Sequence, residues 1–305
     1  MKDLDLKSLR LFLSVCELGN IRQAAQEAHI EPSAISKRIA QLEAELGTPL
    51  LLRGRRGVQP TAAGQTLLEH ARSLRFTLER LEADVAAHAG GVRGQVRLVA
   101  SASAVAESLL DDVARFLRDP RHQGIRIDLE ERLSVDVVRC VREGSASLGV
   151  CWDSVDHGGL VARPYREDEL VLAVHPEHPL AGRLRMPFSA SLGHEHVGLP
   201  PATAVYQMLH RAAARSGQVM SYRIIVSTFD AAMRVVCANL GVSVIPLEVA
   251  QRYARTGEVV TVRLTDAWAR RRFVVLSRET PAPGQAAERM AQHLADLAAE
   301  GPAKG

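Results

Sequence analysis

The chain has 305 residues, of which 47% are hydrophobic, and its 38 Lys and Arg nearly balance 35 Asp and Glu, for a net charge of +3. This length predicts two or three compact domains, and the hydrophobic fraction excludes a wholly disordered chain. So small a net charge also excludes a globally basic nucleic-acid-binding protein. Any DNA-binding surface must therefore gather its positive charge locally.

The first residues, up to Lys7, do not form an apolar stretch flanked by basic residues, so they do not predict a secretory signal. No run approaches the roughly 18 apolar residues that a membrane-spanning helix needs. Cys16, Cys140, Cys151 and Cys237 have neither metal-ligand spacing nor a CxxC pair. We expect a cytoplasmic protein with reduced thiols, no membrane partner, no metal and no cofactor.

Three short helices separated by turn signals are expected before residue 50. The first is predicted by apolar residues at steps of three and four, and Gly19-Asn20 ends it. Asn20 then caps a second helix over 21–28. Pro32 suits the first turn of a third helix over 32–46, which stops at Gly47. The apolar face of the first helix consists of Leu6, Leu9, Phe12, Leu13 and Cys16.

A longer helix is predicted over 61–88, where no proline interrupts the chain. Its apolar residues recur at alternating steps of four and three, which is a heptad seam and favours a dimer through this helix. The alternative is one amphipathic helix packed on its own domain. The predicted dimerisation residues are Leu67, Ala71, Leu74, Leu78, Leu81 and Val85.

After Ala89-Gly90-Gly91, β-rich runs alternate with helical segments, which predicts an α/β fold with a largely parallel sheet, divided into two lobes. The predicted strands are 96–100, 125–129, 148–151, 170–174, 224–226, 242–245, 259–262 and 273–276. The predicted helices are 105–117, 135–141, 204–214, 231–240 and 285–299.

The second and third helices, joined by a tight turn at residues 29–31, match a helix-turn-helix, whose second helix enters the major groove. An ordered string of residues makes this pattern specific. It consists of Leu9–x–x–Phe12, Gly19, Ala24-Ala25, Ser36–x–x–Ile39–x–x–Leu42-Glu43, Leu46-Gly47–x–x–Leu50, Arg53 and Thr61–x–x–Gly64. Over residues 4–64 the chain closely resembles the LysR-type transcriptional regulators. The resemblance implies that 32–46 is the recognition helix and that 50–59 forms a β-wing.

Double-stranded DNA is the partner that this head implies. The expected contacts are Ser33, Ser36, Lys37 and Arg38 on the recognition helix, and Arg53, Arg55 and Arg56 in the wing. Five of these are cations, which supply salt-sensitive contacts with phosphates, whereas the two serines are short side chains that reach base edges or phosphates. The family often has Ser-Gln where this chain has Glu31-Pro32, so the DNA sequence that relatives recognise cannot be transferred.

The resemblance further implies an all-α winged helix-turn-helix at 1–60, a linker and dimerisation helix at 61–89, and an α/β effector-binding domain at 90–305. That domain would resemble periplasmic binding proteins, with lobe one at 92–162 and 267–300 and lobe two at 163–266. The family resemblance suggests a tetramer built as a dimer of dimers. The residues themselves argue only for self-association, so a homodimer and a homotetramer both remain open.

The effector is expected between the lobes, because ligands of α/β sheets bind beyond the carboxyl ends of strands, where helix N-termini offer free N–H groups. The predicted contacts are Ser101, Ser103, Trp152, Thr203 and Thr228. Ser and Thr also cap helices without any ligand, and a tryptophan there could equally belong to the core. Such N–H groups favour negative charge, so we expect a small carboxylate-bearing metabolite that accepts hydrogen bonds from Ser103 and Thr203.

The sequence argues against two other classes of protein. An α/β enzyme would need a catalytic motif, and the chain has no GxSxG, GxGxxG, GxxxxGK or HExxH. A solute-binding transport protein would share the two-lobed domain, but with a signal peptide and without a DNA-binding head. A redox sensor at Cys151 is not favoured, because no basic cluster or resolving cysteine accompanies it. The sequence predicts a regulator, not an enzyme, whose DNA binding a small molecule modulates.

Overall fold

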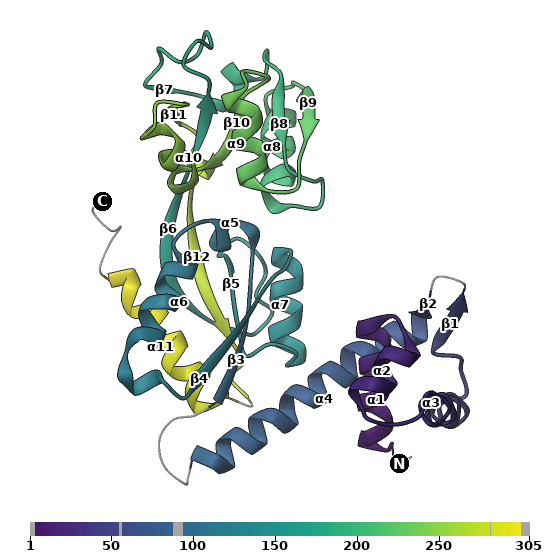
Figure 1. Ribbon diagram of the computed structural model, residues 1–305. Helices are drawn as coiled ribbons and strands as arrows, with labels where there is room; N and C mark the ends of the chain where they lie inside the picture. The colour runs from purple at the N-terminus through teal and green to yellow at the C-terminus, as the bar shows by residue number, and fades with distance from the viewer. Residues whose placement is uncertain (1–3, 55–56, 88–93, 281, 300–305) are drawn as a thin grey trace. The chain divides into compact units, whose positions relative to one another are not determined.

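The computed structural model describes residues 4–54, 57–87, 94–280 and 282–299 (Figure 1). Residue contacts divide the chain into two compact units, one made mainly of the first 85 residues and the other mainly of residues from Ala86 onward. Each unit has its own hydrophobic core. We refer to the first unit as the head and to the second as the lobed unit.

The head begins with α1 (Leu6–Leu18), α2 (Ile21–Glu27) and α3 (Pro32–Leu46). The side chains of Asp5 and Asn20 cap α1 and α2 by accepting backbone N–H groups, and Gly47 ends α3 in the left-handed conformation. These bounds confirm the three helices expected from the sequence. Leu6 is an exception to the expected apolar face, because it is exposed at the first turn of α1.

Apolar side chains from all three helices form the core of the head. Phe12, Ile35 and Ile39 are fully buried there, and the small side chains of Ala24 and Ala25 let α2 approach its neighbours closely. Burial of each large side chain stabilises the head by about 1.5–3 kcal/mol. The head is therefore held together chiefly by the contacts among α1, α2 and α3.

A hairpin of β1 (Leu51–Gly54) and β2 (Gly57–Pro60) follows, and then the long helix α4 (Ala62–Ala87). The Glu43 carboxylate accepts hydrogen bonds from the backbone N–H groups of Leu50 and Leu51, at 2.7 and 3.2 Å, which ties α3 to the hairpin. A Cβ atom added to Gly64 would lie 2.0 Å from the carbonyl oxygen of Leu50. Glycine is thus required where α4 passes the start of the wing.

The first turns of α4 belong to the core of the head. Ala71 is buried there and Leu67 is half-buried against it, so the chain itself covers these two positions of the predicted seam. Farther along, Leu74, Leu81 and Val85 are 44%, 57% and 64% exposed. The part of the heptad stripe that is open to a partner therefore begins at Leu74.

The lobed unit is an α/β structure. Its strands are β3 (Gly94–Ala100), β4 (Ile125–Glu131), β5 (Leu148–Trp152), β6 (Val161–Val174), β7 (Arg185–Met186), β8 (His196–Gly198), β9 (Tyr222–Ile225), β10 (Ser243–Pro246), β11 (Val260–Leu264) and β12 (Arg270–Ser277). Its α-helices are α5 (Ala102–Ala106), α6 (Leu109–Arg118), α7 (Ser134–Glu143), α8 (Ala204–Arg215), α9 (Phe229–Cys237), α10 (Leu247–Ala254) and α11 (Gln285–Ala299). Short 3-10 helices are Pro120–His122, Phe188–Ser191 and Ala267–Ala269.

One long strand, β6, is shared by two lobes. Its residues 161–169 pair antiparallel with β12, and the sheet of lobe one continues from β12 to β5, then β3, then β4. Its residues 170–174 pair antiparallel with β10 and β11 in lobe two. Figure 1 shows β6 and β12 running together from one lobe to the other. The boundary between the lobes therefore lies within continuous strands.

This double crossing corrects the expectation of a largely parallel sheet. The strand pairs β3–β4, β3–β5, β7–β11 and β8–β9 are parallel, whereas every pair that β6 or β12 makes is antiparallel. A chain that leaves lobe one along one strand and returns along its neighbour must place the two in opposite directions. The predicted α/β class is confirmed, but the sheet is mixed.

Candidate functional site

The exposed face of α3 carries the residues expected to contact DNA, but they are not equivalent. Ser33 and Lys37 are exposed and Ser36 is half-buried. Arg38 is engaged within the head, because its Nη1 lies 2.7 Å from Oδ2 of Asp5, the cap of α1. Hydrogen bonds from Ser8 and Lys7, together with the Arg38 charge, lower the pKa of Asp5. Arg38 thus holds α3 against α1 as well as presenting charge.

The wing is described only in part. Arg53 lies in β1, and its backbone is in register with Val58 of β2, but its side chain is outside the described residues. Arg55 and Arg56 lie outside the described residues altogether. Their contacts with DNA stay predictions.

The cleft between the two lobes brings the predicted effector-binding residues together. Ser101, Ser103, Trp152 and Thr203 line one cavity of about 360 Å³. Thr203 and Thr228 line an adjoining cavity of about 450 Å³. The two cavities share Glu131, Leu199 and Phe229, among others, so they form one continuous space. Residues that are distant in the sequence meet here because β3, β5 and the loops before α8 and α9 all end at the cleft.

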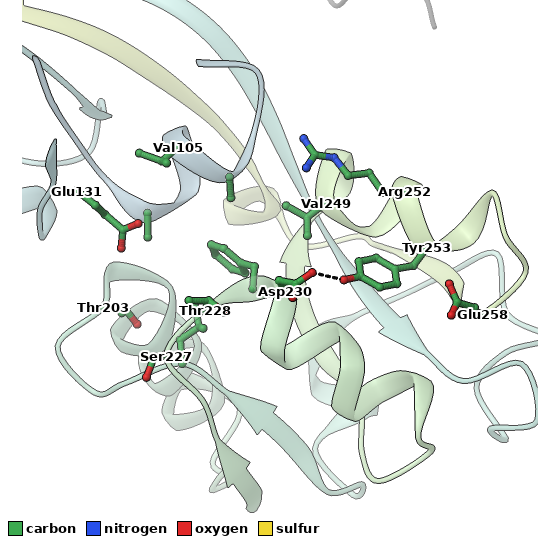
Figure 2. Close-up of a pocket in the computed structure, with 14 residues that line it drawn as sticks. Val105, Glu131, Thr203, Ser227, Thr228, Asp230, Val249, Arg252, Tyr253 and Glu258 are labelled. Carbon is green, nitrogen blue, oxygen red and sulfur yellow. Dashed lines mark hydrogen bonds between the residues drawn. The ribbon is translucent and has the colours of Figure 1, made fainter. Parts of the chain in front are cut away.

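The cavity of about 450 Å³ is acidic. Figure 2 shows Glu131 across from Thr203 and Thr228, with Asp230 and Tyr253 joined by a hydrogen bond beyond them. Glu131, Asp230 and Glu258 oppose a single cation in its lining, Arg252. Negative potential therefore makes this end of the cleft unfavourable for an anion.

The hydroxyl of Thr203 is already in use. Its Oγ1 donates to the carbonyl oxygen of Pro200 at 2.8 Å and accepts the backbone N–H of Tyr206 at 3.3 Å, which caps α8. A hydroxyl has one hydrogen to donate, so Thr203 could donate to a ligand only by giving up its bond to Pro200, and that expected contact stays a prediction. Thr228 likewise caps α9 by accepting the N–H of Ala231 at 3.2 Å.

Two other polar atoms in the cleft lack partners. The Oγ of Ser101 and the Nε1 of Trp152 are buried, and neither has a hydrogen-bond partner within the described part of the chain. Leaving such a group unsatisfied costs about 1–3 kcal/mol. Both residues line the cavity of about 360 Å³, which marks this cavity as a place where a ligand or water completes the hydrogen bonding.

A buried ionic cluster, which the sequence did not reveal, lies behind Trp152. The guanidinium of Arg271 stacks on the indole of Trp152, with Cζ 3.6 Å from the ring centre, and forms an ion pair with Asp168. Its Nη2 lies 3.9 Å from Oε1 of Glu107. Burial raises the pKa of Glu107 to about 8 and lowers that of Arg271 to about 9. Arg271 lies opposite Asp168 in the pairing of β12 with β6, so the ion pair could have been predicted only if this strand pairing had been known.

Other chemistry in the lobed unit is limited. Burial raises the pKa of the Cys151 thiol to about 12, so the reactive thiolate is not formed at neutral pH. Among the residues that the structure describes, no group of three or more His, Cys, Asp or Glu side chains could hold a metal ion. In the same set, no helix is long and apolar enough to cross a membrane.

Known proteins match the chain over both units. The family profile described as "Bacterial regulatory helix-turn-helix protein, lysR family" matches residues 6–65, and that described as "LysR substrate binding domain" matches residues 89–299. The RuBisCO operon transcriptional regulator of Allochromatium vinosum is 26% identical over 285 residues, which is 92% of this chain and 93% of that protein.

Solved structures share the fold. The crystal structure of CbnR, a LysR family transcriptional regulator, has a TM-score of 0.74 at 21% identity, covering 97% of this chain and 99% of that one. Full-length CbnR in complex with its target DNA has a TM-score of 0.72 at 22% identity, covering 97% of this chain and 100% of that one.

Proposed function

The chain belongs to the LysR family of bacterial helix-turn-helix transcriptional regulators, and from this premise we propose that α3 and the wing bind double-stranded DNA while a small organic acid between the lobes controls that binding. The observation that carries the proposal is the pair of unpartnered buried atoms, Ser101 Oγ and Trp152 Nε1, in the cleft of a chain that also carries a helix-turn-helix. DNA as a partner places the action of the protein in the cytoplasm.

The DNA contacts proposed for the head are of two kinds, contacts with base edges and contacts with phosphates. Ser33 and Lys37 are exposed on α3, and Ser36 lies beside them, within reach of base edges or phosphates. The wing arginines, Arg53, Arg55 and Arg56, would neutralise phosphates on the flank of the site. A regulator of this fold has been solved with its target DNA, which supports the assignment.

Self-association is proposed through α4. Leu74, Leu81 and Val85 are exposed on one stripe, with half-buried Leu78 between them. A second copy of the helix would cover this stripe, as in a coiled coil. Two heads joined in this way would bind two half-sites related by two-fold symmetry. A dimer of dimers would extend the arrangement to four half-sites.

The effector is proposed to bind at Ser101, Ser103 and Trp152. A carboxylate accepts hydrogen bonds and so can satisfy both the Ser101 hydroxyl and the Trp152 indole N–H. The acidic end of the cleft disfavours the same group, so the carboxylate would lie toward Trp152. Closure of the lobes around the ligand would shift the protein between two states that hold the paired heads differently.

Selection of binding sites from random duplex DNA by the full-length protein tests the proposal. We expect a site with two-fold symmetry, whose affinity falls steeply with salt. The double substitution Leu74→Lys and Leu81→Lys should yield monomers by light scattering and weaken binding to the two-fold site, because charge would be buried in an apolar seam. Glu82→Lys, on the same helix but off the stripe, is the matched control. Selection that enriches no sequence, or a wild type that is monomeric, would contradict the proposal.

A further inference from the structure

Beyond Trp152 the cleft continues into a recess of about 540 Å³, lined by the start of α7, one face of α8 and the start of β12. We name it the arginine recess, after Arg211, Arg215, Arg270 and Arg271 in its lining. It shares Leu133, Ser134, Trp152 and Ala204 with the cavity that contains Ser101. A ligand that enters between the lobes can therefore reach both cavities.

Positive charges predominate around the arginine recess. Arg211 and Arg215 are one helical turn apart on α8, and Arg270 faces them from the first residue of β12. All three side chains are exposed, and no ion pair or hydrogen bond joins them to other described residues. Asp153 is the one carboxylate in the described lining, and it pairs with Arg272 at 3.3 Å. The recess therefore presents uncompensated positive charge on both walls.

The recess also contains buried donors that lack acceptors, which an ordinary solvated arginine surface would not have. The Arg271 side chain is only 5% exposed, and its Nε and Nη1 have no hydrogen-bond partner within the described part of the chain. The indole Nε1 of Trp152, beneath the same guanidinium, is likewise unpartnered. Exposed arginines at the mouth and unsatisfied donors at the base together describe a site built for an acceptor with negative charge.

We propose that the arginine recess binds a second anionic group of the effector, which is therefore a dianionic organic acid. One acid group lies at Ser101 and Trp152, and the other lies among Arg211, Arg215 and Arg270. Planar guanidinium groups bind carboxylate and phosphate in the same forked manner, so the second group is either of these. This inference rests on the proposed function, because it assigns the effector of the same cleft.

Tryptophan fluorescence reports on the recess directly, because the chain has two tryptophans and both Trp152 and Trp268 line it. The full-length protein would be titrated at constant ionic strength with matched monoanions and dianions, butyrate against glutarate and valerate against adipate. Phosphate against pyrophosphate forms a separate arm, in which both probes carry more than one charge. We expect a saturable change in fluorescence, with the probe of higher charge binding about tenfold more tightly than its partner. The dicarboxylate and pyrophosphate arms identify which anion the recess prefers.

Variants separate this inference from the proposed function. The double substitution Arg211→Gln and Arg215→Gln should abolish the advantage of the dianions. Arg183→Gln with Arg185→Gln removes the same charge from exposed positions in lobe two outside the recess, and should leave that advantage intact. Ser101→Ala should weaken binding of both members of each pair.

The outcomes that would overturn the inference are distinct. Equal affinity for mono- and dianions, a preference that persists in the Arg211→Gln/Arg215→Gln variant, or no saturable change with any probe would each refute the second anion subsite. If the wild type bound mono- and dianions with equal affinity, and Ser101→Ala bound both more weakly, the effector pocket at Ser101 would be supported and the arginine recess would not. The DNA selection described above decides the regulatory function independently.

Discussion

In the head, two polar side chains beside the predicted DNA-binding face are bonded to the chain itself. Arg38 pairs with Asp5, and the Glu43 carboxylate accepts two backbone N–H groups of the wing. In the cleft of the lobed unit, by contrast, Ser101 Oγ and Trp152 Nε1 are buried and have no hydrogen-bond partner among the residues that the structure describes. The head is a preformed surface that needs no ligand to complete it. The cleft is incomplete until a ligand or water supplies acceptors and donors, which is the property expected of a sensor.

The largest expected effect concerns the preformed head. Gly64→Ala would place a Cβ atom 2.0 Å from the Leu50 carbonyl oxygen, so the wing and α4 would have to separate. We expect the free energy of unfolding of the head to fall by about 3 kcal/mol, with loss of DNA binding. Denaturant titration followed by circular dichroism measures this. Gly54→Ala is the control, because the nearest atom to its added Cβ is 3.9 Å away. Equal stability of the two variants would show that the head is not tightly fitted there.

The stability of the lobed unit should depend on pH because the carboxyl of Glu107 is buried. Burial raises the pKa of Glu107 from its ordinary value of 4.5 to about 8. The folded state therefore holds a proton that the unfolded state releases, so this contribution to stability is complete below pH 4.5 and is lost as the pH rises through about 8.

Glu107→Gln cannot release a proton, so it should flatten the loss of melting temperature between pH 4.5 and about pH 8. Glu167→Gln, at an exposed position on β6, should keep the slope of the wild type. A wild-type melting temperature that rises across this range would contradict the assignment.

Two buried serines of the lobed unit allow a direct comparison of partnered and unpartnered hydroxyls. The Ser191 Oγ donates to the carbonyl oxygen of Phe188 at 2.8 Å, so Ser191→Ala should lower the free energy of unfolding by about 1 kcal/mol. Ser101→Ala should leave that free energy unchanged or raise it by up to about 1 kcal/mol, because it removes an unsatisfied group. Chemical denaturation of both variants checks the sign. A clear loss in Ser101→Ala would mean that its hydroxyl is satisfied in the unliganded protein.

The smallest expected effect separates two neighbouring cations on α3. Lys37 is exposed, whereas the charge of Arg38 is already opposed by Asp5. Lys37→Ala should reduce the slope of log affinity against log salt by about one, and Arg38→Ala should reduce it by less. Fluorescence anisotropy with duplex DNA over a range of salt concentrations measures both slopes. Equal reductions would show that Arg38 leaves Asp5 when DNA binds.

Elements with local signals were predicted well. The helix over 32–46 was bounded correctly because its two ends depend on neighbouring residues, Pro32 at the first turn and Gly47 in a left-handed conformation. The predicted dimerisation stripe needed a correction of a different kind. Periodicity shows that Ala71 and Leu74 lie on one face of α4, but it cannot show that the head of the same chain already covers Ala71.

Elements that depend on distant partners were missed or misjudged. The helix predicted over 105–117 is interrupted after α5, where the Ser108 hydroxyl donates to the Glu248 carboxylate at 2.7 Å. The short strands β7 and β8 and the helix α10 were not predicted, and α9 begins at Phe229, two residues earlier than expected. The strands β7 and β8 depend on pairing with β11 and β9, which are distant in the sequence, and a pattern of neighbouring residues does not encode such pairing.

The candidate site shows the same division. Serines and threonines that follow strands predicted the cleft, because helix caps depend on neighbouring residues. Their hydrogen-bond partners were not predictable, and the bond from Thr203 to the carbonyl oxygen of Pro200 is an example. The arginine recess was missed although part of its signal was present. Arg211 lies one turn beyond Gln207 within the predicted helix over 204–214, and Arg215 lies one turn farther. What the sequence could not show was that β12 returns to face that helix.

The unbroken course of β6 has an evolutionary consequence. Its 14 residues belong to the sheets of both lobes without an intervening loop, so the register of residues 170–174 with β10 and β11 is tied to the register of residues 161–169 with β12. Insertion or deletion of one residue near Glu169 would turn every side chain of the following segment to the opposite face, so Leu170 and Leu172 would have to repack where Val171 and Ala173 are buried, or a bulge would be forced. Loops elsewhere in the domain can lengthen independently in each lineage. At this crossing, changes that preserve the count of residues keep the strand pairing of both lobes in register.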